Sequence, residues 1–432
     1  MVSSELKYKD SGEFWMGQIP EHWDLLKLKH LFHEKKIKHN PELGAGSISF
    51  GEVVRKADTS IPESTKASYQ EVLKDEFLIN PLNLNYDLKS LRIALSEIDV
   101  VVSSGYIVLK DHQKINKRFY KYLLHRYDVD YMKLLGSGVR QTINFNHISS
   151  SILAYPPLEE QTAIANFLDI KTAEIKRFIQ LKEKTIELLK ERKTAIINEA
   201  VTKGLDSNVE MKDSGIEWLG EIPKHWEVKK LKYLIQGKLK YGANESAELD
   251  NPDYPRYIRI TDFGNDGKLR EDTFKSLAPK TAEGYFLEEG DILFARSGGT
   301  VGKTFLFKDY TGKACFAGYL IRARVNDLLS SDLLYLFSKS GAYEKWKDSI
   351  FNQATIQNIG ADKYSVLPIP VPSIYEQSQI IDYCHKRIIE IENLMYQAEK
   401  EISLMKEYQE SLISEAVTGK IDVREENEAI TR

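Results

Sequence analysis

Two stretches of the chain carry apolar residues at heptad spacing and contain neither glycine nor proline. They run from about residue 159 to 201 and from about 374 to 417. The pattern predicts two long helices that form each other's core. Lys182 and Lys193 interrupt the first apolar seam, and Gln409 interrupts the second. The first seam comprises Leu168, Ile175, Ile179, Ile186, Leu189, Ile196 and Ala200. The second comprises Cys384, Ile388, Ile391, Met395, Ala398, Ile402, Met405, Leu412 and Ala416.

Capping and stop residues mark the ends of both predicted helices. Pro157 precedes the first helix, and Ser373 with Glu376 three residues later forms a capping box for the second. Gly204 and Gly419 follow the last apolar positions, where helices commonly end. Each helix is therefore expected to run without a break.

Outside these helices, short apolar runs alternate with turn residues. The runs at 99–102, 106–109, 257–260, 291–294 and 304–307 predict strands, and 119–126 and 333–347 predict short helices. We therefore expect an α+β protein, with two globular domains joined by two long antiparallel coiled-coil helices. The expected domains are residues 1–157 and 206–372, and the helical regions are 158–205 and 373–432.

The chain is an internal duplication. The pattern DSGxxWxGxIPxHW at residues 10–23 recurs at 213–226, and Glu160-Gln161 recurs as Glu376-Gln377. Between such anchors the two halves differ almost completely. Two similar units in one chain usually pair about a pseudo-two-fold axis, which makes the helices antiparallel. Each half thus combines anchor motifs that both halves share with a middle segment whose sequence is its own. This pattern suggests two sites that recognise different ligands or different parts of one ligand.

The distribution of charge matters more than the net charge of −4. Residues 20–157 and 223–372 each carry a net charge of +3, whereas residues 373–432 carry −6. Each middle is too weakly basic to hold DNA by charge alone. If DNA is the ligand, a partner is expected to supply part of the phosphate contacts. Cys315 and Cys384 have no disulfide or zinc spacing and are expected to be buried thiols. A polar N-terminus and the lack of a long apolar stretch favour a cytoplasmic protein without membrane contact.

Several motifs in order give the chain a family resemblance. They are the two DSGxxWxGxIPxHW frames, the run GDILFARSGG at 290–299, the segment ATIQNI at 354–359 and a proline-rich entry to each Glu-Gln helix. Over nearly its whole length the chain resembles the specificity subunits of type I restriction–modification systems. The resemblance implies two target-recognition domains that bind a bipartite, asymmetric target in double-stranded DNA.

The same resemblance implies a non-catalytic chain. Its implied partners are two modification (methyltransferase) subunits and restriction (translocase/nuclease) subunits. No cofactor is implied for this chain itself, and S-adenosylmethionine, ATP and Mg²⁺ are expected in the partner subunits. The alternative is a rod-like protein-interaction scaffold whose DNA binding is incidental, which the weak basicity favours.

Three motifs imitate catalytic signatures. Residues 297–304 nearly form a phosphate-binding loop, but a β-like run follows where a helix is required, so a DNA-facing hairpin tip or a structural turn competes with a nucleotide site. Asn251-Pro252-Asp253-Tyr254 has aspartate at the third position of a methyltransferase-like motif, and no donor loop accompanies it. Pro252-Asp253 with 266–268 has only loose metal-nuclease spacing, and the histidines form no helical metal pair.

Residues that could read DNA are those able to form bidentate bonds with base edges and their hydroxyl-bearing neighbours. Any single arginine among them has a surface ion pair as its alternative role. In the first middle they are Arg92, Ser103, Ser104, Arg140, Gln141, Asn144 and Asn146. In the second they are Arg256, Arg259, Arg296, Ser297, Thr300, Lys303, Arg322, Arg324, Gln353, Gln357 and Asn358.

Overall fold

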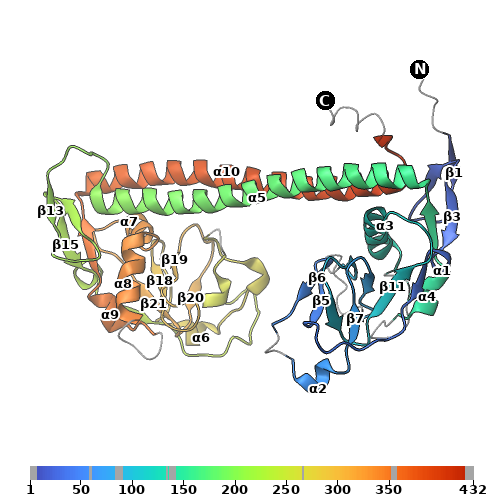
Figure 1. Ribbon diagram of the computed structural model, residues 1–432. Helices are drawn as coiled ribbons and strands as arrows, with labels where there is room; N and C mark the ends of the chain where they lie inside the picture. Colours follow the sequence, from blue (N-terminus) through green and yellow to red (C-terminus); the bar gives the residue numbers. More distant parts are fainter. Residues whose placement is uncertain are drawn as a thin grey trace. The chain divides into compact units, whose positions relative to one another are not determined.

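The computed structural model describes residues 7–57, 61–82, 91–132, 135, 143–264, 267–351 and 358–423. The chain divides into two compact units (Figure 1). Unit 1 consists of residues 1–182 and 400–432, and unit 2 consists of residues 183–399. Helix α5 (Leu158–Lys203) and helix α10 (Ile374–Val417) each contribute one end to each unit.

Unit 1 is built on a four-stranded antiparallel sheet in the order β4-β11-β8-β9, where these strands span Phe32–Glu34, Ile107–Asp111, Phe77–Ile79 and Ile93–Leu95. Helix α3 (Lys117–Asp130) buries Phe119, Tyr120 and Leu123 in the core of this unit. The other elements are β1 (Tyr8–Asp10), β2 (Gln18–Pro20), β3 (Asp24–Lys27), α1 (Leu28–Leu31), β5 (Gly46–Ser49), β6 (Glu52–Arg55), α2 (Glu63–Lys66), β7 (Gln70–Val72), β10 (Val100–Val102), α4 (Phe145–Ser149) and β12 (Ile152–Tyr155).

Unit 2 repeats this sheet in the order β16-β21-β18-β19, where the strands span Lys240–Tyr241, Leu320–Ala323, Ile292–Ala295 and Thr304–Leu306. A parallel pair of β17 (Arg256–Ile258) and β20 (Ala314–Phe316) contributes to two further small cores. The other elements are β13 (Met211–Asp213), β14 (Glu221–Pro223), β15 (Glu227–Lys230), α6 (Pro279–Ala282), α7 (Ser331–Phe337), α8 (Gly341–Phe351), α9 (Ala361–Ser365) and β22 (Pro368–Val371).

The strand register shows which hairpins are equivalent in the two units. In unit 1, Leu78 pairs with Val108 on one side and with Ala94 on the other. In unit 2, Phe294 pairs with Ile321 on one side and with Thr304 on the other. Hairpin β8–β9 therefore corresponds to hairpin β18–β19. Their connecting segments are residues 80–92 and 296–303.

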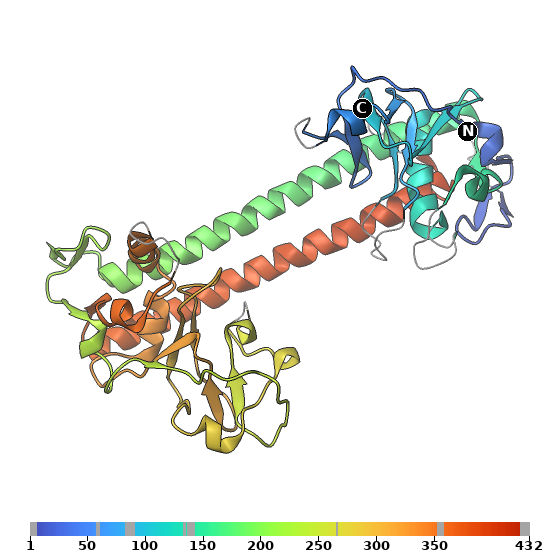
Figure 2. The same ribbon diagram turned by 90° about the horizontal axis from the view of Figure 1, so that it is seen from below.

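Within each unit the two long helices pack antiparallel, and both views show them side by side there (Figures 1 and 2). The last turns of α10 bury Leu412 and Ala416 in the core of unit 1, which also holds Leu168 of α5. The last turns of α5 bury Ala200 in the core of unit 2, together with Cys384 of α10. The seams expected from the heptads are buried or partly buried.

The lysines that interrupt the first seam are accommodated by ion pairs between the helices. In unit 1 the Lys182 ammonium contacts the Glu401 carboxylate. In unit 2 the Lys193 Nζ lies 2.6 Å from Glu392 Oε1. A lysine can lie along an apolar seam in this way because its methylene stem packs while its charged end reaches a partner at the edge.

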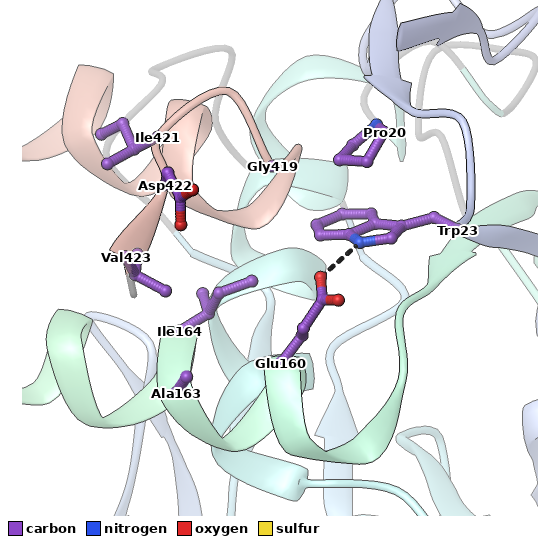
Figure 3. A pocket seen from close by; sticks show the side chains of 9 residues that line it. All are labelled: Pro20, Trp23, Glu160, Ala163, Ile164, Gly419, Ile421, Asp422 and Val423. Atoms are coloured by element: carbon purple, nitrogen blue, oxygen red, sulfur yellow. Dashed lines mark hydrogen bonds between the residues drawn. The ribbon is translucent and has the colours of Figure 1, made fainter. Parts of the chain in front are cut away.

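The repeated His-Trp and Glu-Gln motifs meet at the start of each long helix. In unit 1 the indole N–H of Trp23 donates to Glu160 Oε2 over 2.8 Å, and His22 Nε2 lies 2.8 Å from the other carboxylate oxygen. Figure 3 shows this bond beside a small cavity of about 30 Å³ that is also lined by Ile164, Gly419 and Val423. The stop glycine Gly419 has a φ of +70°, and a Cβ there would lie 2.9 Å from the Trp23 ring.

Unit 2 forms the same junction with its own residues. Trp226 Nε1 donates to Glu376 Oε1 over 3.0 Å, and His225 Nε2 lies 3.1 Å from Glu376 Oε2. The Ser373 hydroxyl accepts from the Glu376 backbone N–H over 3.3 Å, as a cap requires. The Glu376 side chain, however, turns to the indole and imidazole. The sequence pattern predicted the helix start correctly, but this carboxylate joins the repeated frame to the helix.

The structure confirms an α+β chain with an internal repeat and two long helices. Two local predictions were wrong. The expected strand at 257–260 ends at Ile258, because a 3₁₀ turn at Ile260–Asp262 follows it. The expected helix at 333–347 is two helices, α7 and α8, because the Ser338 and Ser340 hydroxyls donate to carbonyls in the last turn of α7 and the chain turns there.

Candidate nucleic-acid interface

One exposed polar turn among the predicted DNA-reading residues is the tip of hairpin β18–β19. Gly298, Gly299 and Thr300 are exposed, and the strand β19 follows the tip directly. The turn is closed by the Gly302 N–H, which donates to the Ala295 carbonyl over 2.8 Å. The Tyr343 hydroxyl of α8 donates to the Gly302 carbonyl over 3.0 Å. The segment that resembles a phosphate loop is therefore a braced hairpin tip.

Arg296 lies where this tip leaves the sheet. Its guanidinium carbon is 5.0 Å from the centre of the Tyr241 ring, a cation–π arrangement. Its Nε is buried without a hydrogen-bond acceptor among the described residues. The Arg296 carbonyl accepts from the Ile359 N–H over 2.9 Å, and Ser297 bridges to Asn358. The structure thus brings Arg296, Ser297, Thr300 and Asn358 together.

Two tyrosines that were not among the predicted DNA-reading residues extend this group. The Tyr241 ring lies under the Arg296 guanidinium, and the Tyr241 hydroxyl accepts a hydrogen bond from the Ala361 N–H over 2.9 Å. Tyr319 is 61% exposed, and its carbonyl accepts from the Arg296 N–H. Tyr319 lies in the turn before β21 and lines a cavity of about 290 Å³ together with Tyr257, Arg259 and Asn244.

Four predicted DNA-reading arginines of unit 2 are engaged inside the fold, so we remove them from the candidate interface. Arg256 is 1% exposed and lies between the rings of Phe274 and Tyr310. Arg324 forms a two-pronged pair with the buried Asp291, at 2.8 and 2.7 Å. The other two arginines are also held by neighbours: Arg259 by Asp262 and the Thr273 carbonyl, and Arg322 by the Phe286 carbonyl.

In unit 1 the predicted site residues that the structure describes lie in three different segments. Arg92 ends the connecting segment 80–92, but it is buried and its Nε donates to Asp128 over 3.0 Å, so it too is occupied inside the fold. Ser103 and Ser104 are exposed in the turn between β10 and β11. Asn144 caps α4, with its side chain accepting from the His147 N–H over 3.2 Å, and Asn146 is exposed on that helix.

Of the five other predicted site residues, the structure describes only Lys303. Lys303 is partly buried at the start of β19. Arg140, Gln141, Gln353 and Gln357 lie outside the described residues. The methyltransferase-like segment is a turn in which the Asn251 side chain accepts from the Asp253 N–H over 2.9 Å. No group of three potential metal ligands is found among the described residues. No described helix is both long and apolar enough to cross a bilayer.

Comparison with known proteins assigns this arrangement to a family. The profile of the type I restriction modification DNA specificity domain matches residues 20–191 and, again, residues 223–402. The chain belongs to this family. The resemblance seen in the sequence is confirmed, and the two matches coincide with the two halves of the repeat.

Other members of the family resemble the chain along most or half of its length. The type I restriction enzyme MjaVIII specificity subunit of Methanocaldococcus jannaschii is 23% identical over 428 residues, or 95% of each chain. The type I restriction enzyme EcoKI specificity subunit of Escherichia coli is 25% identical over 210 residues, which are 47% of this chain and 44% of that one.

Solved structures share the fold. A chain from a study of complex assembly and conformational transition of the type I R-M system matches with a TM-score of 0.71 at 14% identity, covering 93% of this chain and 99% of that one. The HsdS subunit from Thermoanaerobacter tengcongensis matches with a TM-score of 0.52 at 14% identity, covering 93% of this chain and 98% of that one. The family fold is thus present in both halves of the chain.

Proposed function

We propose that the chain recognises a bipartite, asymmetric target in double-stranded DNA, with one part read by each unit. In this proposal the chain performs no chemistry. It positions two adenine methyltransferase subunits and the restriction subunits of a type I restriction–modification complex on the DNA. S-adenosylmethionine, ATP and Mg²⁺ belong to those partners.

One observation carries the proposal. The same hairpin of the same four-stranded sheet has a different connecting segment in each unit, residues 80–92 in unit 1 and 296–303 in unit 2. The junctions of the repeated frame with the long helices, by contrast, use the same residue types in both units. A preserved sheet and helix junction with different hairpin tips is expected if each tip recognises a different DNA sequence.

The chemistry of the tip in unit 2 supports contact with base edges. The major groove of B-DNA admits a two-stranded ribbon, and arginine forms two hydrogen bonds with the O6 and N7 acceptors of guanine. Arg296 is held against the Tyr241 ring by a cation–π contact, and Gly298 and Gly299 have no Cβ to keep a duplex away. Such an arginine is pre-positioned and loses little side-chain freedom on binding.

The long helices supply a surface for protein partners. Exposed apolar residues on a coiled coil are otherwise unfavourable in water, so their accumulation indicates contact with another protein. In unit 1 they include Ile170, Leu404 and Tyr408. In unit 2 they include Leu188, Tyr375, Tyr383, Ile389, Leu394 and Tyr396.

The proposal is tested by selection from a random duplex library with the full chain co-purified with its methyltransferase partner. The expected result is enrichment of two different short sequences separated by a fixed unread gap. Arg296→Ala should relax one of the two sequences and leave the other, because a bidentate contact contributes about 1–3 kcal/mol of discrimination. No enrichment with the wild-type complex would refute DNA recognition and favour the protein-interaction scaffold.

A further inference from the structure

Four lysines of unit 2 gather at the base of hairpin β18–β19. Lys303 directly precedes the return strand β19, Lys339 follows α7, Lys347 lies on α8 and Lys193 lies on α5. The ammonium groups of Lys303 and Lys193 are close enough to Lys339 to disfavour its charged form. The Lys347 stem lies against the backbone of Gly302, where an added Cβ would come within 2.5 Å of it. The four lysines therefore lie beside the base of the hairpin whose tip is formed by residues 296–303.

Carboxylates only partly balance this positive charge. Glu344 pairs with Lys347, and Glu392 pairs with Lys193. Among the described residues, no ion pair joins Lys303 or Lys339 to a carboxylate. Four lysines against two glutamates leave a net charge of +2 at the base of the hairpin.

Lys339 is held in a defined position. Its Nζ donates to the Thr304 carbonyl over 3.0 Å and lies 4.6 Å from the centre of the Tyr335 ring. The Thr304 hydroxyl is itself 2.6 Å from the Ser338 hydroxyl, which ties β19 to the end of α7. Burial, with the positive charges of Lys303 and Lys193, lowers the pKa of Lys339 to about 8. A perturbed pKa of this kind is common at functional sites.

We propose that Lys303 and Lys339 bind the phosphate backbone of DNA and thereby fix the register of the 296–303 tip on the duplex. The inference rests on the proposed function and deepens it. Phosphate contacts orient a protein on DNA without reading sequence, whereas base-edge contacts read it. The two lysines supply the first kind of contact and Arg296 supplies the second. Lys303 and Arg296 lie at the two ends of the segment 296–303.

This division of labour matches the chemistry of the two groups. The lysine ammonium is a compact point charge that suits a phosphate oxygen, whereas the planar guanidinium of Arg296 suits two acceptors on one base edge. A phosphate between Lys303 and Lys339 would offset the repulsion between them. Binding would then be strongest on any duplex at low salt, with sequence preference added by the tip.

The test measures binding of the full chain, co-purified with its methyltransferase partner, to two duplexes of about three helical turns. One duplex has random sequence and the other carries the target found by selection. The variants are Lys339→Met, Lys303→Gln and their combination. Lys303→Arg keeps the positive charge. Lys308→Gln is the matched control, because Lys308 follows the other end of β19 and is 3.4 Å from Asp332.

The expected result is a shallower dependence of log Kobs on log salt, by about 0.9 for each lysine removed, and equally on both duplexes. Lys303→Arg and Lys308→Gln should keep the wild-type slope. Unchanged slopes for Lys339→Met and Lys303→Gln would overturn the inference, even if the wild type prefers its target. A wild type without target preference, combined with shallower slopes for both variants, would instead refute sequence recognition and leave the phosphate contact standing.

Discussion

The arginines of unit 2 show that residue type alone does not decide function. Arg256 and Arg296 are both flanked by aromatic rings, yet Arg256 is enclosed by Phe274 and Tyr310, whereas Arg296 lies at the base of an exposed tip. The sequence could nominate both as DNA-reading candidates. It could not separate them, because their partners come from segments far away in the chain.

Substitution of these two arginines should give opposite results. Arg256→Ala should lower the free energy of unfolding by about 2–4 kcal/mol, because a buried side chain loses its packing and its bond to the Arg270 carbonyl. It should leave the recognised sequence unchanged. Arg296→Ala should hardly change stability and should relax one part of the target. Urea unfolding and duplex selection measure the two effects, and a sequence change caused by Arg256→Ala would return that residue to the interface.

Lys339 should make the stability of the protein depend on pH. Its pKa is about 8 in the fold and about 10.4 in an unfolded chain, so the unfolded state binds more protons between these values. Stability should therefore rise as the pH increases through this window, and the penalty of the buried charge is fully present below it. Lys303, Lys193 and Glu344 are the charged groups that act on Lys339.

Lys339→Met removes this penalty. At about pH 7 the variant should be more stable than the wild type by about 1–3 kcal/mol, after loss of the bond to the Thr304 carbonyl. The difference should shrink as the pH rises above about 8. Urea unfolding at several pH values measures it, with Lys308→Met as the control. A variant less stable than the wild type at neutral pH would show that the ammonium is well satisfied where it is.

At the scale of elements, the sequence predicted correctly those helices whose ends and apolar faces follow from local residue patterns. The long helices were found nearly to the residue, because heptad spacing, the absence of glycine and proline, and the stops at Gly204 and Gly419 all agree with α5 and α10. The break between α7 and α8 was missed, because apolar spacing continues across Ser338 and Ser340. The pairing of β8–β9 with β18–β19 as equivalent hairpins was also hidden, because it depends on sheet register.

The helix seam makes a matched prediction within unit 1. Ile175 and Lys182 lie one heptad apart on α5, and Ile175 is 4% exposed. Ile175→Ala should lower the free energy of unfolding by about 2–4 kcal/mol by leaving a cavity. Lys182→Met should change it by less than about 1 kcal/mol, because its partly exposed pair with Glu401 contributes little and methionine can pack in the seam. Equal effects in thermal unfolding would mean that the seam is not the core of the helix pair.

At the scale of the whole molecule, duplication was the strongest signal in the sequence. The repeated tryptophans and glutamates reappear as two equivalent junctions, Trp23 with Glu160 and Trp226 with Glu376. Divergence between the frames indicated where the recognising parts lie, but not which residues form them. In unit 1 the segment 80–92, equivalent to the tip in unit 2, held only Arg92 among the predicted residues, and that side chain is buried.

The central claim is that the two units read two parts of one DNA target independently. The direct test uses a hybrid chain in which residues from about 25 to 155 are replaced by the corresponding segment of a relative. Methylated adenines are mapped genome-wide in cells that carry this hybrid and the partner subunits. The repeated frames and both long helices remain unchanged. We expect one part of the methylated sequence to change and the other to stay the same. A hybrid in which both parts change would contradict independent reading by the two units.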